Sequence, residues 1–244
     1  MTQSIKVLFV TTSNDKLGDT NTLTGVWLEE FTAPYYIFKD AGIDITVASP
    51  KGGPVPMDPK SQSIIVATQS SRRFLKDADA MKMLSNSISL QEIKAADFDM
   101  VFIPGGHGPL WDLADNKILN ELLDEFNREE KPIGAVCHGV VALIALHNEK
   151  GDPLLKGKNL TAFSNTEEES AGLVKIVPFL LETELVSLGA VYSKAANYIS
   201  HVVTDGNIIT GQNPASSEAL AKAMIVLLRH NQFLALSRKE PFLN

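Results

Sequence analysis

The chain of 244 residues contains a single cysteine, Cys137, and no long hydrophobic run. One cysteine permits no intramolecular disulfide, which fits a protein of a reducing compartment. No apolar segment is long enough to span a bilayer, and the apolar run near the N-terminus is too short for the core of a signal peptide. We therefore expect a cytoplasmic protein that has no membrane as its partner.

Positive charge is also scarce. The chain has 22 Lys and Arg residues against 29 Asp and Glu residues, for a net charge of −7, and its basic residues do not cluster. This balance argues against a surface that binds nucleic acid. Hydrophobic residues make up 44% of the chain, an ordinary globular composition, and no repeat, low-complexity tract or linker divides it. We expect residues 1–244 to form one domain.

Short apolar segments rich in β-branched residues alternate with longer helical patterns. This order predicts βαβ units and therefore an α/β fold, a three-layer sandwich with a mainly parallel sheet of the flavodoxin-like type. The expected strands are 5–10, 44–49, 99–103, 131–136, 159–164 and 190–195, with a hairpin over 201–211 that turns at Asp205-Gly206. The expected helices are 24–42, with a kink or unusual turn at Pro34, and 114–130, 138–146, 177–189 and 214–231. A loop dense in Gly and Pro, followed by short helices, predicts an inserted segment near residues 55–95.

The only cysteine lies where a predicted strand meets a predicted helix, in "KPIGAVCHGVVALIAL". Ala135 and Gly139 stand two residues before and after Cys137, as the small residues of a nucleophile elbow do. A thiol at the start of a helix should have a lowered pKa and raised reactivity, and His138 follows it directly. The alternative is that Cys137 is a small buried hydrophobic residue and that His138 has no chemical task.

A second glycine turn, "IPGGHGPLWDL", also follows a strand. Gly105 and Gly106 let the backbone approach a ligand and present N–H groups to an anion. Because ligands bind at the carboxyl ends of parallel strands, both turns should lie at one edge of the sheet. His107 either lines the resulting pocket or is a solvated loop residue.

Taken in order, "KVLFVTTSND", "TGVWLEE", "VFIPGGHGPLWDL", "GAVCHG", "LTAFSNTEEE" and "TGQNPASS" resemble the ThiJ/PfpI superfamily, which has a class I glutamine amidotransferase-like fold. More narrowly, the chain is similar to the subgroup that contains heat-shock-inducible chaperones and glutathione-independent glyoxalase III enzymes. The resemblance covers nearly the whole chain and implies a homodimer.

The resemblance also implies roles for individual residues. A glutamate on the first helix of the family hydrogen-bonds the nucleophilic thiol, and the matching residue is Glu30; Glu29 would lie on a different face of the helix. The backbone N–H groups of Gly106 and His138 match the oxyanion donors. Taken alone, Glu30 would be read as a solvated surface carboxylate.

A third acidic residue, which orients the histidine, should lie in "SNTEEES", where Glu167, Glu168 and Glu169 compete. Spacing from Phe163 favours Glu168. The alternative is that this acidic run forms the first turn of a helix, capped by Asn165 or Thr166 and stabilised by the helix dipole.

These features imply glyoxalase III chemistry on a small 2-oxoaldehyde such as methylglyoxal, with Cys137 as nucleophile and no metal, cofactor or glutathione. Deglycase activity would use the same thiol. Alternatives are an amidase or peptidase and a chaperone or stress sensor whose cysteine is oxidised. A glutamine amidotransferase proper is less favoured because the His-x-Glu pair is missing. Metal binding by Cys137, His138 and His107 is disfavoured by their spacing.

Overall fold

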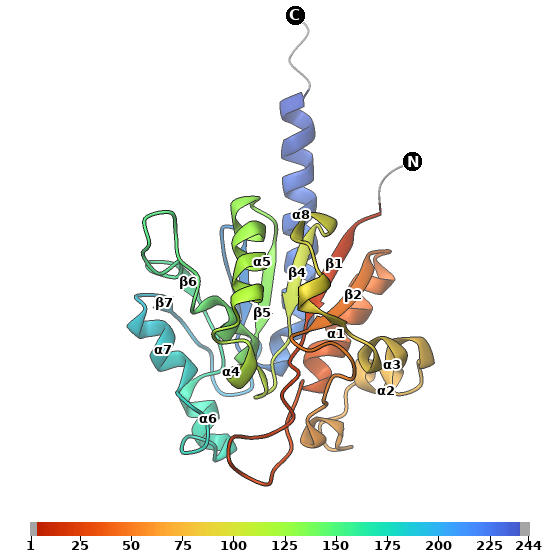
Figure 1. Cartoon of the computed structure of the whole chain (residues 1–244), viewed down its shortest axis with the longest axis vertical. Helices are drawn as coiled ribbons and strands as arrows, with labels where there is room; N and C mark the ends of the chain where they lie inside the picture. The colour runs from red at the N-terminus through yellow and green to blue at the C-terminus, as the bar shows by residue number, and fades with distance from the viewer. Residues whose placement is uncertain (1–3, 240–244) are drawn as a thin grey trace, which may run out of the picture.

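The computed structural model describes residues 4–239 and forms an α/β sandwich around a seven-stranded sheet with the order β3-β2-β1-β4-β5-β9-β8 (Figure 1). All neighbouring strands pair in parallel except β8, which runs antiparallel to β9 at one edge. The predicted fold class is confirmed. The strands of this sheet are β1 (Lys6–Val10), β2 (Asp44–Ser49), β3 (Ile88–Ser89), β4 (Met100–Ile103), β5 (Ile133–Val136), β8 (Val202–Asp205) and β9 (Ile208–Gly211).

Helices cover both faces of the sheet. The α-helices are α1 (Leu28–Asp40), α2 (Gln69–Phe74), α3 (Ala78–Ser85), α4 (Pro109–Asp112), α5 (Lys117–Arg128), α6 (Asn165–Ala171), α7 (Leu181–Ser187) and α8 (Ser217–Lys239). The 3₁₀ segments are η1 (Pro59–Gln62), η2 (Leu90–Glu92), η3 (Ala95–Asp97), η4 (Cys137–Leu143) and η5 (Pro214–Ser216). Helices α1 and α8 pack together on one face, and α5 and η4 pack on the other. The far end of α8 extends past the sheet, at the end where β1 begins (Figure 1).

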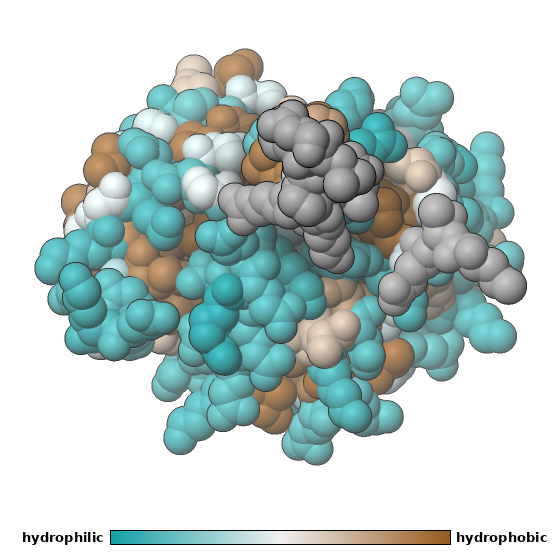
Figure 2. All heavy atoms as spheres, turned by 90° about the horizontal axis from the view of Figure 1, so that it is seen from above, coloured by the Kyte–Doolittle hydropathy of each residue, from teal (hydrophilic) through white to brown (hydrophobic). Residues whose placement is uncertain are grey.

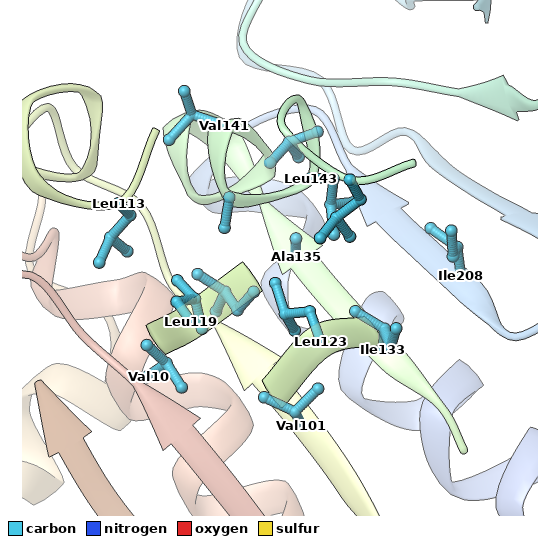
Figure 3. Packing of buried hydrophobic residues seen from close by; sticks show 14 of the residues in the cluster. Val10, Val101, Leu113, Leu119, Leu123, Ile133, Ala135, Val141, Leu143 and Ile208 are labelled. Carbon is cyan, nitrogen blue, oxygen red and sulfur yellow. The ribbon is translucent and has the colours of Figure 1, made fainter. Parts of the chain in front are cut away.

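Two apolar layers form the core because alternate side chains of a strand point to opposite faces. Leu8 and Val10 of β1 join the cluster that contains α5 and η4, whereas Val7 and Phe9 join the cluster under α1 and α8. Figure 3 shows the first cluster, with Leu119 and Leu123 of α5 against the strand residues Val101, Ile133 and Ala135. Burial on both faces explains why the central strands are apolar without alternation in the sequence.

The predicted helix over 138–146 is wrong. A 3₁₀ segment, η4, occupies Cys137–Leu143 instead, and every one of its residues is buried. Gly139 and the β-branched Val140 and Val141 favour an α-helix weakly, and tertiary packing decides the conformation of so short a segment. Pro34, by contrast, lies inside α1 without ending it.

The hairpin over 201–211 is confirmed, but its turn lies one residue later than predicted. Asp205 pairs with Ile208, so the two loop residues are Gly206 and Asn207. The strands expected at 159–164 and 190–195 shrink to β6 (Asn159–Leu160) and β7 (Val191–Tyr192), which pair with each other in a separate parallel sheet. The closing helix begins at Ser217, after η5, and runs beyond the predicted end to Lys239.

The segment between β2 and β4 contains η1, α2, α3, β3, η2 and η3, in the region where an insertion of loops and short helices was expected. Within residues 4–239, no helix is both long and apolar enough to cross a membrane. Figure 2 views the end of the molecule from which α8 extends, where hydrophilic residues cover much of the surface and hydrophobic ones form small groups.

Candidate active site

Cys137 lies at a sharp turn directly after β5. Its backbone φ is 57°, a value that residues other than glycine rarely adopt. Gly139 makes this turn possible, because a Cβ atom there would lie 2.4 Å from the carbonyl oxygen of Ile103. The backbone thus has the geometry predicted for a nucleophile elbow. It brings Cys137 to the carboxyl edge of the sheet.

The thiol begins a chain of hydrogen bonds. Cys137 Sγ lies 3.3 Å from His138 Nδ1, and His138 Nε2 lies 2.6 Å from Glu168 Oε2. If Nε2–H donates to the carboxylate, Nδ1 is left with a lone pair that faces the thiol. Cysteine, histidine and glutamate are therefore arranged in the order of a catalytic triad.

The charges of this chain follow from its burial. Burial, together with the neighbouring His107, lowers the pKa of His138 to about 4, although Glu168 opposes this shift. Burial alone would raise the pKa of Glu168, but hydrogen bonds from His107 and His138 outweigh it and lower the pKa to about 2. At neutral pH, His138 is uncharged and able to accept a proton, and Glu168 is a carboxylate able to stabilise the imidazolium that results.

His107 lines the pocket and is not a solvated loop residue. It is 9% exposed, and its Nε2 lies 2.8 Å from Glu168 Oε1. The ring centroids of His107 and His138 lie 4.1 Å apart. The ring of Phe163 packs against His138, with 4.5 Å between their centroids. Both imidazoles are thereby fixed by one carboxylate and one aromatic wall.

Glu30 lies on α1, fully buried beside Cys137, as the resemblance implied. The backbone N–H of Gly105 donates to its Oε2 at 2.7 Å, while Oε1 is buried and has no hydrogen-bond partner among the described residues. Burial raises the pKa of Glu30 to about 8, against the opposing effects of the neighbouring Cys137 thiol and the Gly105 N–H. At neutral pH this carboxyl group therefore holds a proton.

The expectation of a lowered thiol pKa is wrong. Burial raises the pKa of Cys137 well above its ordinary value, and Glu30 raises it further; the backbone N–H of His138 lowers it only in part. The segment after the thiol is a short 3₁₀ turn and not the predicted α-helix, so no long helix dipole points at the sulfur. At neutral pH the thiol is therefore protonated, with His138 Nδ1 within reach of its proton.

The two glycines of the second turn have different tasks. The N–H of Gly105 is taken by Glu30, so Gly105 positions that carboxyl group and does not offer this donor to a ligand, contrary to expectation. Gly106 lines the pocket with a φ of 85°. A Cβ atom at Gly106 would lie 2.2 Å from the Gly25 carbonyl oxygen, so the loop requires glycine here.

Of the three competing acids, Glu168 is the one that reaches His138. Glu167 is buried in another network, where it accepts hydrogen bonds from the backbone N–H of Tyr198 and from the side chains of Gln212 and Asn213. Glu169 is exposed. The acidic run does begin a helix, α6, but Ser164 caps it instead of Asn165 or Thr166.

Glu29 also lines the pocket. Its side chain points to different partners from those of Glu30: Thr68 and Ser70 at the start of α2 both donate to its carboxylate. Burial raises its pKa. Glu29 thus links the helix of Glu30 to the inserted segment.

The pocket has a volume of about 570 Å³ and is lined by Cys137, His138, Glu30, Gly106 and His107 together with residues that the sequence did not single out. Those that contribute large side chains are Leu17, Leu23, Trp27, Val66, Phe163, Leu173 and Tyr198. They come from loops and elements spread over the whole chain, so only the folded topology brings them together. A local signal exists for Trp27 and Phe163, in the segments "TGVWLEE" and "LTAFSNTEEE".

A metal ion would find a different set of ligands from the one considered above. Among residues 4–239, the ligand atoms of His107, His138 and Glu168 lie within 4.8 Å of one another, so Glu168 takes the place of Cys137. Both imidazole Nε2 atoms already face the carboxylate of Glu168. A metal would have to displace these two hydrogen bonds, so the trio fits its own network better than an ion.

Residues 22–227 match the model of the DJ-1/PfpI family. The chain belongs to this family. The predicted resemblance is confirmed.

Family members with similar sequences and structures include named glyoxalases. The glutathione-independent glyoxalase HSP31 of Saccharomyces cerevisiae is 30% identical over 236 residues, covering 92% of this chain and 98% of that protein. Glyoxalase III of Candida albicans has a crystal structure that superposes with a TM-score of 0.84 at 27% identity, over 91% of this chain and 97% of that one. The Rapid Encystment Protein 24 KDa of Francisella tularensis superposes with a TM-score of 0.88 at 40% identity, over 92% and 99% of the two chains.

Proposed function

We propose that this protein is a glutathione-independent glyoxalase that converts 2-oxoaldehydes of the methylglyoxal type to 2-hydroxy acids. The observation that carries the proposal is the chain Cys137–His138–Glu168, with protonated Glu30 beside the thiol and a pocket in front of it. The names of the similar proteins support the same reaction class.

In the first step, Cys137 Sγ would attack the aldehyde carbon while His138 Nδ1 accepts the thiol proton. A carbon–sulfur bond forms, and the developing oxyanion would be held by the backbone N–H groups of Gly106 and His138. Glu168 would stabilise the imidazolium. This route suits a thiol whose pKa is raised, because no free thiolate has to exist before the substrate arrives.

The imidazolium would then return its proton to the oxyanion, giving a hemithioacetal and freeing Nδ1 to accept the proton on the aldehyde carbon. Protonated Glu30 would donate to the neighbouring carbonyl oxygen as the enediol forms. The His138 imidazolium would then give its proton to the second carbon while the hydroxyl of the first carbon returns a proton to the Glu30 carboxylate, which leaves a thioester. Water hydrolyses the thioester and releases the thiol. The aldehyde carbon is oxidised, its neighbour is reduced and one water is consumed, so no external oxidant is needed.

The test is to incubate the protein with methylglyoxal in the absence of glutathione and to measure D-lactate enzymatically. The expected result is steady D-lactate production that Cys137→Ala abolishes. An intact Cys137→Ala protein, checked by its thermal unfolding, that still forms D-lactate would overturn the proposal. Turnover of amide substrates without D-lactate formation would assign the same residues to an amidase.

A further inference from the structure

The pocket is larger than the substrate named above needs. Pockets of about 300–1,000 Å³ hold ligands of the size of drugs. The pocket in front of Cys137 has a volume of about 570 Å³, whereas methylglyoxal is a three-carbon molecule. A substrate that used the whole pocket would carry a much larger group on its keto carbon than a methyl group.

The walls of the pocket are mainly apolar. Phe163 and Leu173 are buried walls, 6% and 8% exposed. Leu23, Val66 and Tyr198 line the same pocket yet keep 57%, 40% and 48% of their surfaces exposed. Large apolar side chains held open to water in a concave site are typical of a site that binds an apolar group.

The charged groups that line the pocket disfavour an anionic substituent. Glu29 and Asp58 are acidic, and Lys60 is the one Lys or Arg among the described lining residues, whose two histidines and Glu30 are uncharged or engaged in the catalytic network. Two of these carboxylates are engaged in internal hydrogen bonds: Glu29 with Thr68 and Ser70, and Asp58 with the hydroxyl of Thr24 and the backbone N–H of Lys60. A carboxylate on the substituent of the substrate would meet like charge.

We infer that the preferred substrates are 2-oxoaldehydes with a bulky, uncharged apolar substituent, either aryl or branched alkyl, on the keto carbon. The inference rests on the proposed function and adds a substrate class to it. The reaction is the same internal redox step, in which phenylglyoxal and one water give mandelate through the Cys137 thioester. The substituent would lie against Phe163, Leu173 and Val66 while the two carbonyl carbons face the thiol.

The experiment compares kcat/KM for glyoxal, methylglyoxal and phenylglyoxal without glutathione. Apolar surface buried in a matched pocket is worth tenfold or more for even a small group, so we expect kcat/KM for phenylglyoxal to exceed that for methylglyoxal by at least about tenfold. Glyoxal, which has no substituent, should be the poorest of the three.

The three aldehydes differ in intrinsic reactivity, and comparing a variant with the parent protein on the same substrates removes this difference. Val66→Asp places a charge on the apolar wall and should lower the ratio of kcat/KM for phenylglyoxal to that for methylglyoxal by about five- to tenfold. Val186→Asp is the matched control, because Val186 on α7 is 53% exposed and does not line the pocket. It should leave the ratio unchanged.

The inferred substrate class would be overturned if kcat/KM for methylglyoxal equals or exceeds that for phenylglyoxal and Val66→Asp does not change the ratio of the two values. The proposed function would then remain intact. Loss of the ratio in both Val66→Asp and Val186→Asp would also overturn the inferred substrate class. No turnover of any of the three aldehydes would remove the proposed function itself.

Discussion

Glu30 and Cys137 are two acids in one buried space, and each, once ionised, raises the cost of ionising the other. Replacing Glu30 by Gln keeps a polar group against the Gly105 N–H but removes the carboxylate that raises the thiol pKa. We expect the pH midpoint of alkylation by iodoacetamide to fall in Glu30→Gln, because the charge of the Glu30 carboxylate no longer opposes ionisation of the thiol. Turnover should fall at the same time, since the proton donor beside the substrate is lost.

The control for this variant is Glu169→Gln, which changes an exposed glutamate. Its alkylation profile should match that of the parent protein. An unchanged midpoint in Glu30→Gln would show that the carboxyl group does not act on the thiol.

Glu168 should matter for catalysis and Glu167 for stability, although they are neighbours. Glu168→Gln places an amide against both His107 and His138 and disturbs the tautomer that leaves Nδ1 free, so we expect kcat to fall about 10²- to 10⁴-fold at temperatures where the variant is still folded. Glu167→Gln breaks a buried network and should lower the Tm. The comparison needs steady-state kinetics and thermal unfolding of both variants; the reverse pattern would exchange the two roles.

Among single residues, the sequence was sufficient to predict site residues that are marked by their neighbours in the chain. It was insufficient for residues that join the site only through tertiary packing. Cys137 and His138 could be predicted from the small residues around them. Glu30 and Glu168 needed the family resemblance, because α1 and α6 meet the elbow only in the folded chain. The pKa of the thiol could not be predicted from the sequence, because it depends on burial and on the carboxyl group of Glu30, which lies 107 residues before Cys137 in the chain. The role of Glu29 depended in the same way on contact with α2.

At the scale of elements, the central strands were predictable and the connections were not. Strands β1, β4 and β5 are buried on both faces over nearly their whole length, so each appears in the sequence as an apolar run. The segment after Cys137 is equally apolar, and apolar patterning alone does not separate an α-helix from a buried 3₁₀ turn. Strand β6 pairs over only two residues, so its hydrophobic pattern in the sequence is too short to predict where the strand begins and ends.

The elbow itself yields a prediction about stability. Gly139→Ala would place a methyl group 2.4 Å from the Ile103 carbonyl oxygen, so the backbone must shift, and we expect the free energy of unfolding to fall by about 2–4 kcal/mol. Gly172→Ala is the control, because its φ is 73° and its Cβ would meet nothing within 4 Å. It should cost only the left-handed backbone penalty of about 1–2 kcal/mol. Equal losses in urea unfolding would show that η4 has room at Gly139.

At the scale of the whole molecule, Glu30, His138 and Glu168 are three of the buried groups that couple folding to pH. The pKa of Glu30 rises from 4.5 to about 8 on folding, so stability falls as the pH rises between these values. The pKa of His138 falls from 6.5 to about 4, so stability falls as the pH drops through that range. The pKa of Glu168 falls from 4.5 to about 2, which removes further stability below pH 4.5.

Between pH 4.5 and 6.5 the effects of Glu30 and His138 oppose each other, so stability should be greatest and nearly constant there. From pH 6.5 to 8 only Glu30 among these three groups titrates differently in the two states, and we expect a loss of up to about 1.4 kcal/mol per pH unit. Urea unfolding at a series of pH values measures this profile. Glu30→Gln should abolish the loss above pH 6.5 and keep the loss below 4.5, whereas Glu169→Gln should follow the parent throughout. Parallel curves for Glu30→Gln and the parent from pH 6.5 to 8 would mean that Glu30 ionises in the folded protein as it does in water.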